Sequence, residues 1–218
     1  MPPIKTNLAN KNNYGSSRST ANIKYIVIHY TGNDGDTDEG NGNYFKNNIV
    51  KASAHYFVDD DSITQSVPDN YVAWSVGGNK YASCSTTGGG KHYGKCTNSN
   101  SISIEICDDV KNGTVYPSAK TIQNALELTK LLMEKYNVNA NNVIRHFDVT
   151  GKLCPAYWVD DAKWKSEFWN KLSGVKISKV EKYRDIVKER FGFEDRTIEW
   201  LATYKSAEPL FEKLATKK

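Results

Sequence analysis

Two histidines and one cysteine are the residues of this chain best suited to metal chemistry. His29 follows the apolar run "YIVI", His146 follows "NVIR", and Cys154 stands eight residues later, in front of Pro155. A catalytic zinc ion takes three protein ligands from His, Cys or carboxylate and keeps a fourth position for water. Taken singly, a His at a strand end is more often structural, and a buried Cys usually acts as a small hydrophobe. Side chains on two strands and one loop can nevertheless converge, so these three residues are candidate ligands of one metal ion.

Other cysteines allow two further arrangements. Cys84 and Cys96 flank a Gly-rich loop and could pair in an oxidising setting. Together with His92 they could also form a structural zinc site, although no Cys-x-x-Cys pair supports this arrangement. An even number of cysteines without a secretory signal is not a disulfide framework by default. The sequence therefore leaves the state of Cys84 and Cys96 open.

The segments that must position the candidate ligands alternate between strands and helices. "IKYIVIHYTG" is a continuous apolar, β-branched run that is typical of a buried central strand. Residues 54–60 and 63–68 predict a hairpin, and residues 142–146 predict a short strand. In the strand predicted over 101–109, three isoleucines share one face, while Glu105 lies on the other face.

Helical patterns alternate with these strands. One helix is predicted after Ser118 and another over residues 160–172. This alternation indicates an α/β fold in which a central mixed β-sheet is flanked by helices. Three short amphipathic helices are predicted from about 178 to 216. We therefore predict a main domain over residues 1–174 and a small all-helical module over residues 175–218.

Composition and charge exclude some classes of function. The net charge is +4, and the segment from Val175 onward carries eleven basic and eight acidic residues, an excess of +3. This weak, mixed charge argues against nucleic acid as a partner. No apolar run approaches the roughly 20 residues that span a membrane, and the N-terminal segment lacks an apolar signal core. We expect a protein made in the cytoplasm without a signal peptide.

Between residues 78 and 100 the chain is polar, Gly-rich and without a clear period. Long irregular segments inside compact domains are often functional, so a lid or a wall of a substrate groove is expected here. No Gly-Lys-Ser/Thr follows the spacing of a phosphate-binding loop.

Four blocks, in a fixed order, resemble one enzyme family. "IKYIVIHYTG", "SAHYFVDDDSITQSVPDNYVAWSVGG", "NSNSISIEICDD" and "VIRHFDVTGKLCP" are similar to the type-2 zinc N-acetylmuramoyl-L-alanine amidases. That superfamily includes phage endolysins, bacterial autolysins and animal peptidoglycan recognition proteins. The resemblance covers about residues 20–172. It implies a zinc ion at one end of a peptidoglycan groove and hydrolysis of the amide bond between N-acetylmuramic acid and L-alanine.

The resemblance also implies roles for individual residues. The zinc ligands of the family fall on His29, His146 and Cys154, where some members use Asp in place of the cysteine. Glu105 matches the acidic residue that acts on the attacking water, and Lys152 matches a residue that stabilises the transition state.

Further residues are expected to support this site. Asp148 would orient a ligand or its loop, since a metal-bound histidine commonly needs such an acceptor. His55 is expected to be structural or to line the groove. Tyr56 and Trp74 are candidate substrate contacts, although buried packing is the favoured interpretation for both.

At two positions the chain departs from the family pattern. Some phage members have a catalytic Tyr immediately before the position of His55, where this chain has Ala54. The proton transfer would then pass to Glu105. Many members also have a histidine in the block "AWSVGG", where this chain has Ser75.

We therefore expect a zinc amidase that lyses cell walls, of endolysin or autolysin type, from a phage or a bacterium. It would act on a wall, expected to be Gram-positive, after release by a holin or by lysis. The helical module would bind the wall, with wall teichoic acid as a candidate partner for its basic excess. Two alternatives are a non-catalytic peptidoglycan-binding protein and a cytoplasmic muropeptide-recycling amidase. Cys154 argues against the first and the additional module against the second, while the oligomeric state stays open.

Overall fold

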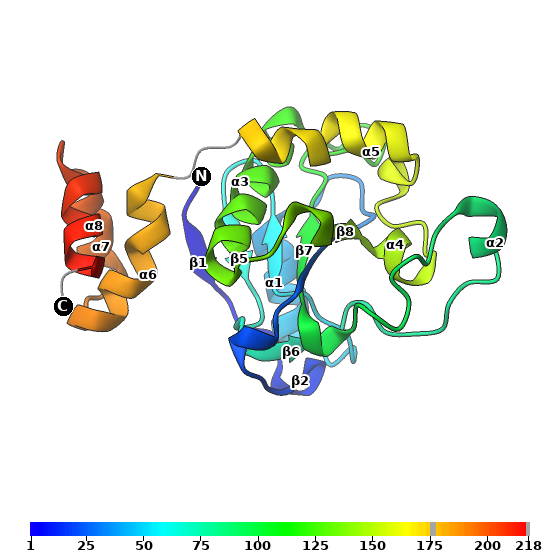
Figure 1. The fold of residues 1–218 in the computed structure, drawn as a ribbon, viewed down its shortest axis with the longest axis horizontal. Coiled ribbons are helices and arrows are strands. Elements are labelled where there is room, and N and C mark those ends of the chain that lie inside the picture. Colours follow the sequence, from blue (N-terminus) through cyan, green and yellow to red (C-terminus); the bar gives the residue numbers. More distant parts are fainter. Residues whose placement is uncertain (175–177, 217–218) are drawn as a thin grey trace. The chain divides into compact units, whose positions relative to one another are not determined.

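The computed structural model describes residues 1–174 and 178–216 (Figure 1). The chain divides into two compact units, Met1–Gly174 and Val175–Lys218, and each unit is described by itself. Residues 175–177, where the sequence predicts the start of the C-terminal module, lie outside the described residues.

A six-stranded mixed β-sheet forms the centre of the first unit, in the order β1-β5-β4-β7-β3-β8. The pair β4–β5 is antiparallel and forms the predicted hairpin, whereas the other neighbouring pairs are parallel. The predicted fold class, a mixed sheet flanked by helices, is confirmed. The strands are β1 (Ile4–Thr6), β3 (Tyr25–Tyr30), β4 (Tyr56–Val58), β5 (Ile63–Gln65), β7 (Ser101–Ile106) and β8 (Val143–Arg145).

The register of the central strands already places reactive side chains together. In the β3–β7 pair, His29 lies opposite Glu105, and in the β4–β7 pair, Phe57 lies opposite Glu105. Side chains at opposite positions of neighbouring strands point to the same face of a sheet. One face of the sheet therefore carries His29 and Glu105 side by side near the carboxyl ends of β3 and β7.

The longest helix, α3 (Ala119–Tyr136), packs against β3, β4 and β7 (Figure 1). Its start agrees with the sequence, because the Ser118 hydroxyl accepts a hydrogen bond from the backbone amide of Thr121. Within residues 1–174 and 178–216, no helix combines the length and apolar character that crossing a membrane requires. The shorter α-helices of this unit are α1 (Asp38–Asn47), α2 (Cys84–Thr87), α4 (His146–Thr150) and α5 (Asp161–Glu167).

The single helix predicted over residues 160–172 is wrong in its length. Helix α5 ends at Glu167, and a 3-10 helix over Trp169–Gly174 follows it. Phe168 between them has a non-helical φ of −131° and a fully buried ring. That ring stacks on Trp164 at 5.1 Å and contacts Trp158 at 5.0 Å. Burial of this aromatic cluster outweighs continuation of the helix.

Several elements were not predicted from the sequence. They are the helices α1, α2 and α4, the edge strand β1, and a two-stranded antiparallel sheet of β2 (Tyr14–Ser17) and β6 (Tyr71–Ala73). Short 3-10 helices also occur at Lys11–Asn13, Thr20–Asn22, Asn98–Asn100, Ala140–Asn142 and Ala156–Trp158.

Helix α1 forms despite the poor helix propensity of its glycines and asparagines. The Thr37 side chain caps its first turn. The buried Asp38 carboxylate accepts hydrogen bonds from Ser62 Oγ at 2.9 Å and Thr64 Oγ1 at 2.8 Å. At Gly42, an added Cβ would lie 2.7 Å from the Thr64 methyl group, so only glycine permits this approach to β5. Contacts with distant residues therefore stabilise a helix that local propensity does not favour.

The second unit contains the three predicted helices, α6 (Lys179–Phe191), α7 (Asp195–Ala202) and α8 (Ala207–Thr216). Each helix contributes apolar side chains to one small core, as their amphipathic spacing predicts. The buried members of this core are Val180, Val187, Ile198, Ala207 and Phe211.

Candidate active site

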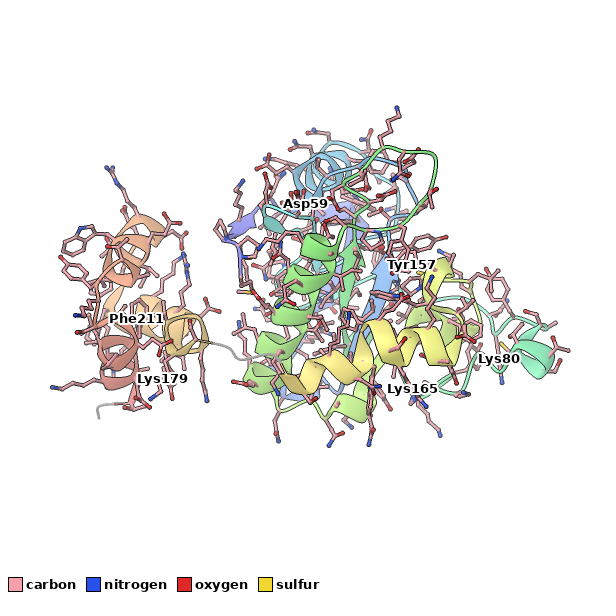
Figure 2. All side chains as sticks on the ribbon, turned by 90° about the horizontal axis from the view of Figure 1, so that it is seen from above. Asp59, Lys80, Tyr157, Lys165, Lys179 and Phe211 are labelled. Atoms are coloured by element: carbon pink, nitrogen blue, oxygen red, sulfur yellow. The ribbon has the colours of Figure 1, made fainter. Side chains whose placement is uncertain are left out.

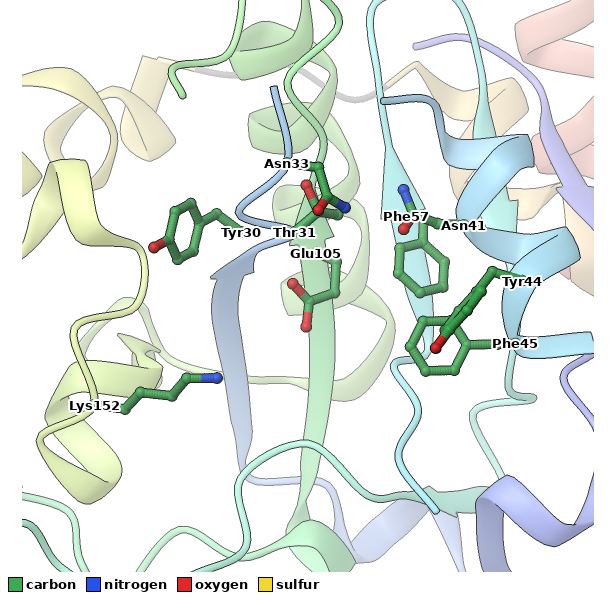
Figure 3. A pocket seen from close by; sticks show the side chains of 9 residues that line it. All are labelled: Tyr30, Thr31, Asn33, Asn41, Tyr44, Phe45, Phe57, Glu105 and Lys152. Carbon is green, nitrogen blue, oxygen red and sulfur yellow. The ribbon is translucent and has the colours of Figure 1, made fainter. Parts of the chain in front are cut away.

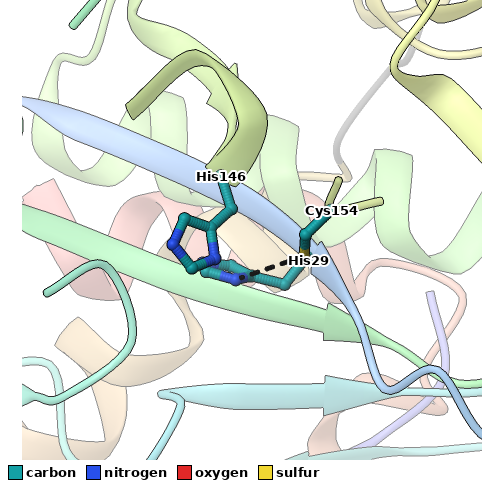
Figure 4. Close-up of side chains that lie close together, drawn as sticks. All are labelled: His29, His146 and Cys154. Carbon is teal, nitrogen blue, oxygen red and sulfur yellow. Dashed lines mark hydrogen bonds between the residues drawn. The ribbon is translucent and has the colours of Figure 1, made fainter. Parts of the chain in front are cut away.

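The three candidate ligands converge in the structure (Figure 4). His29 lies near the end of β3, His146 begins α4 directly after β8, and Cys154 lies in the loop that follows. One donor atom from each residue lies within 4.8 Å of the others, and all three side chains are buried. His29 Nδ1 is 3.7 Å from Cys154 Sγ. These residues therefore form a group that could hold a metal ion.

The protonation of the group suits a metal ion. Burial, reinforced by the charges of His146 and Lys152, holds the pKa of His29 well below its usual range. Burial also lowers the pKa of His146 to about 4, so both imidazoles are neutral and offer a lone pair. Among the described atoms, His29 Nε2 and His146 Nδ1 are buried without a hydrogen-bond partner. Burial raises the pKa of the Cys154 thiol, so a metal ion would have to displace its proton.

A buried arginine anchors the start of the ligand loop, residues 146–154. Arg145 donates to both carboxylate oxygens of Asp148 at 2.9 and 2.7 Å, and to Asp161 at 2.6 Å. The Arg145 backbone amide also donates to Asp148 at 2.9 Å. Bidentate pairing of this kind adds geometric restraint. Asp148 therefore holds the first turn of α4, which carries His146.

The Gly-rich segment 78–100 supports the ligand loop from outside. Backbone amides of Tyr81, Gly90 and His92 donate to carbonyl oxygens of α4 at 2.8 to 2.9 Å. The last carbonyls of a helix have no partner within the helix, and these bonds satisfy them. Residues of this segment do not line the cavity beside Glu105, and their observed contacts are with the ligand loop.

The close packing of Gly151 against Cys84 predicts that a larger residue at position 151 destabilises the protein. Gly151 has a φ of +86°, and an added Cβ would collide with the Cys84 sulfur. Gly88 also has a left-handed φ, +74°, but open space around it. Gly88→Ala should therefore cost about 1–2 kcal/mol of unfolding free energy from strain alone, and Gly151→Ala about 1–3 kcal/mol more from overpacking. Urea unfolding of both variants measures the difference, and equal losses would contradict the close packing.

Beside the metal group lies a cavity of about 520 Å³ (Figure 3). Glu105 lines it, with an exposed side-chain fraction of 19%, and its Oε1 lies 3.7 Å from His29 Nδ1. Lys152 reaches from the ligand loop toward the strand that carries Glu105. Both proposed catalytic residues therefore face one space next to the ligands. The remaining lining residues are Tyr30, Thr31, Asn33, Asn41, Tyr44, Phe45 and Phe57.

The environment of Glu105 suits proton transfer. Burial raises the pKa of Glu105 to about 8, while Lys152 acts in the opposite direction. A carboxyl group that titrates near neutral pH can both accept a proton and return it. The positive charge of a metal ion beside it would favour the ionised form. Glu105 can therefore act as a base once the group holds a metal ion.

His55, Tyr56 and Trp74 do not line this cavity. His55 is fully buried, and its Nδ1 accepts a hydrogen bond from a β7 backbone amide at 3.1 Å. Its pKa falls to about 4, because burial and the neighbouring Arg18 disfavour the charged form. The Tyr56 hydroxyl donates to the buried Asp69 at 2.7 Å. Trp74 is half-buried. The contacts of His55 and Tyr56 are those of core residues.

Much of the cavity wall was missed by sequence reasoning. Asn41, Tyr44 and Phe45 come from α1, whose residue types gave no helical signal. Phe45 stacks on Phe57 at 5.4 Å, which attaches this wall to the sheet. Tyr30, Thr31 and Asn33 directly follow His29, and their place at the carboxyl end of a parallel strand was a usable signal.

The alternative arrangements of cysteines are not formed. Cys84, Cys96, Cys107 and Cys154 are all free and buried. In the described part of the chain, the groups with the composition of a metal site are the His29 group and a cluster of Asp38, Asp59 and Asp61. Neither contains Cys84, Cys96 or His92.

Known proteins share this chain's sequence and fold. The family model described as N-acetylmuramoyl-L-alanine amidase matches residues 19–157. The amidase CwlL of Bacillus licheniformis is 33% identical over 160 residues, which are 71% of this chain and 42% of that protein. The amidase CwlA of Bacillus subtilis (strain 168) is 31% identical over 162 residues, which are 74% of this chain and 54% of that protein. The chain thus spans about half the length of these relatives.

Solved structures match the fold. The catalytic domain of XlyA has a TM-score of 0.59 and 29% identity, covering 80% of this chain and 99% of that chain. A mutant endolysin from Bacillus subtilis has a TM-score of 0.60 and 29% identity, covering 81% of this chain and 100% of that chain. The matched range, residues 19–157, contains His29, His146 and Cys154. This chain belongs to the N-acetylmuramoyl-L-alanine amidase family.

Proposed function

We propose that this protein hydrolyses the amide bond between N-acetylmuramic acid and L-alanine in peptidoglycan, as a lytic amidase of endolysin or autolysin type. The observation that carries the proposal is the convergence of His29, His146 and Cys154 beside a cavity that Glu105 and Lys152 line. A protein that only bound peptidoglycan would not require all three candidate metal ligands together with a carboxyl group, that of Glu105, beside them. Residues 1–174 would form the catalytic domain, acting at a Gram-positive wall after release from the cell.

Zinc is the metal ion that this donor set favours. Neutral imidazole nitrogens and a thiolate suit zinc better than magnesium or calcium, and three protein ligands are the pattern of a catalytic site. When bound, zinc supplies Lewis acidity and lowers the pKa of water. His29, His146 and Cys154 would hold it, and their burial would keep competing solvent away.

The chain's own residues would move the proton and stabilise charge. The Glu105 carboxylate would accept a proton from the attacking water and deliver it to the leaving amine of L-alanine. The Lys152 ammonium group would stabilise the negative charge that develops on the carbonyl oxygen. Ala54 is buried against Phe57 and Cys107 and brings no polar side chain to this work.

Digestion of purified cell walls tests the reaction. The amidase proposal requires new N-terminal L-alanine without new reducing sugar ends, because only the lactyl–alanine amide bond is broken. New reducing ends without new N-terminal L-alanine would instead indicate a glycosidase and would overturn the proposal.

We further propose that the helical unit, residues 175–218, binds the cell wall. Trp200 and Tyr204 are 59% and 49% exposed, and their rings meet edge to face at 4.9 Å. Tyr and Trp are enriched at interfaces, and their flat apolar rings suit the apolar faces of wall sugars. The excess positive charge of this segment supports wall teichoic acid as an additional partner.

Loss of one ring should weaken wall binding measurably. Trp200→Ala should raise the dissociation constant for purified walls roughly 2- to 12-fold, from a ring contact of about 0.5–1.5 kcal/mol. Ile186→Ala, which alters an apolar side chain on α6 that is 48% exposed, is the matched control. A chain ending at Gly174 should keep hydrolysis but pellet less with walls. Equal pelleting of the full chain, the shortened chain and Trp200→Ala would refute a role in targeting.

A further inference from the structure

Two asparagines, Asn33 and Asn41, line the same end of the cavity beside Glu105 (Figure 3). Asn33 lies in the loop after β3, and Asn41 lies in α1. The proposed hydrolysis gives neither residue a role. A side-chain amide offers two N–H donors and one carbonyl acceptor, so the partner of its nitrogen decides which atom remains for a ligand.

One carboxylate, that of Asp36, holds both amide nitrogens. Its Oδ2 accepts hydrogen bonds from Asn33 Nδ2 at 3.2 Å and from Asn41 Nδ2 at 2.6 Å. Asn41 Nδ2 also donates to the Thr37 carbonyl oxygen at 2.8 Å. Carboxylate and carbonyl oxygens only accept, so the amide nitrogens must be the atoms that face them. Within residues 1–174 and 178–216, neither Oδ1 atom accepts a hydrogen bond, so both carbonyl oxygens remain for a ligand.

The Asp36 carboxylate is itself fixed by the loop that follows β7. Its Oδ1 accepts a hydrogen bond from the Asp108 backbone amide at 2.9 Å, and the Asp36 backbone amide donates to the Asp108 carbonyl oxygen at 2.7 Å. Asp34 accepts from two further backbone amides of that loop, each at 2.9 Å. Figure 2 shows α1 and this loop on the same side of the unit, where Asp59 is labelled. The two amides are therefore oriented before a ligand arrives, which lowers the entropy cost of binding.

A cavity end that presents only carbonyl oxygens suits a ligand group that only donates hydrogen bonds. Sugar hydroxyls both donate and accept, and an amide with its nitrogen and its oxygen free would match them better. Backbone N–H groups of a peptide are pure donors. In peptidoglycan, the stem peptide carries such groups directly beside the bond that this protein is proposed to cleave.

We propose that Asn33 and Asn41 determine specificity by accepting hydrogen bonds from backbone N–H groups of the stem peptide, and that Asp36 positions them. The inference rests on the proposed function, because it assigns a peptide to the cavity beside Glu105. Asp36 does not touch the ligand itself. Without its carboxylate each amide could rotate and turn its NH₂ group toward the cavity, where a second donor would oppose the peptide N–H.

Binding of a soluble stem peptide to the full chain tests the inference without hydrolysis. The probe is the tetrapeptide L-Ala-γ-D-Glu-L-Lys-D-Ala, which lacks the scissile bond, and its dissociation constant is measured by calorimetry. Two analogues replace the backbone N–H of D-Glu or of L-Lys with an ester oxygen. We expect at least one ester to bind the natural chain roughly 2- to 12-fold more weakly, as loss of one hydrogen bond implies. That loss should disappear in Asn33→Ala or in Asn41→Ala, because the acceptor is already gone.

Asp36→Ala should reduce the same ester loss, although it leaves both asparagines in place. Asp34→Ala is the matched control, since it removes a carboxylate that fastens the same two loops together but holds neither amide. Its ester loss should equal that of the natural chain. If Asp36→Ala folds poorly, Asp36→Asn keeps the shape of the side chain and should also reduce the ester loss, because it has one acceptor oxygen where two are needed.

Esters that bind the natural chain as well as the peptide does would overturn the inference, as would an ester loss that persists in both asparagine variants. Absence of peptide binding to the natural chain would overturn it too. Weaker binding only after acetylation of the lysine ammonium group would identify that group as the donor and contradict a backbone N–H. Walls hydrolysed by a chain that fails these tests would leave the proposed function intact. The expected ester losses in a chain that leaves walls intact would support the hydrogen bonds and refute the hydrolysis.

Discussion

Replacing Glu105 with Gln is expected to lower the rate of cell-wall hydrolysis by about 10²–10⁴-fold, the usual contribution of a general acid–base group. Glutamine has nearly the same shape but cannot take the proton of the attacking water. Glu105 lines the cavity that also contains Lys152, and the register of β3 and β7 places it opposite His29. Hence the side chain that is changed lies next to the group that would hold the metal ion.

The rate is measured as release of N-terminal L-alanine from purified walls. Zinc content must be measured in parallel, because Glu105 Oε1 lies only 3.7 Å from His29 Nδ1. A variant that bound less zinc would also hydrolyse walls more slowly, even if Glu105 were not the base. Glu39→Gln, at an exposed glutamate paired with Lys5, is the control for charge. A Glu105→Gln variant with full zinc content and an unchanged rate would rule out the assigned role.

Replacing Cys154 with Ser is expected to remove both metal binding and hydrolysis. Loss of a direct ligand should lower zinc affinity by more than the roughly 10–100-fold that follows loss of a ligand's hydrogen-bond partner. A serine hydroxyl does not ionise near neutral pH and is a poor zinc ligand, so two histidines would remain in a buried site. The natural chain treated with a chelator should lose the same activity and regain it when zinc is added.

The control for this substitution is Cys96→Ser, which also exchanges a buried thiol for a hydroxyl. Cys96 packs in an apolar cluster with Val27, Val76, Ile144 and Val149, outside the metal group. The Cys96→Ser variant should have a lower free energy of unfolding but keep one zinc ion per chain, measured by elemental analysis. Equal zinc content in the Cys154 and Cys96 variants would show that Cys154 is not a ligand.

The centre of the fold could be predicted because its signals are local. An apolar, β-branched run predicts β3. The alternation of isoleucine with polar residues predicts β7 and separates Glu105 from the isoleucines of the same strand. Ser118 marks the start of α3 in both sequence and structure. The three C-terminal helices likewise follow their apolar spacing. Each of these features depends on residues within a few positions of one another.

The candidate ligands were a different case, because His29, His146 and Cys154 are individually unremarkable by type and spacing. The resemblance of four ordered blocks selected them, and the parallel pairing of β3 with β8 brings the first two together. The family resemblance assigned roles to Glu105 and Lys152 but said nothing of Asn41, Tyr44 and Phe45, which line the cavity from α1. Such a feature exists only in the packed structure.

The sequence by itself thus determined the central strands, helix α3, the three C-terminal helices, the fold class and the residues with the chemistry of a metal site. Only the tertiary structure decided that α1 forms a cavity wall, that segment 78–100 supports the ligand loop, and that Phe168 ends α5. It also decided that Asp148 binds Arg145 and that His55 and Tyr56 are core residues. The physical reason is the same throughout. These features arise from burial and hydrogen bonds between segments that lie far apart in the sequence, and such contacts outweigh local propensity.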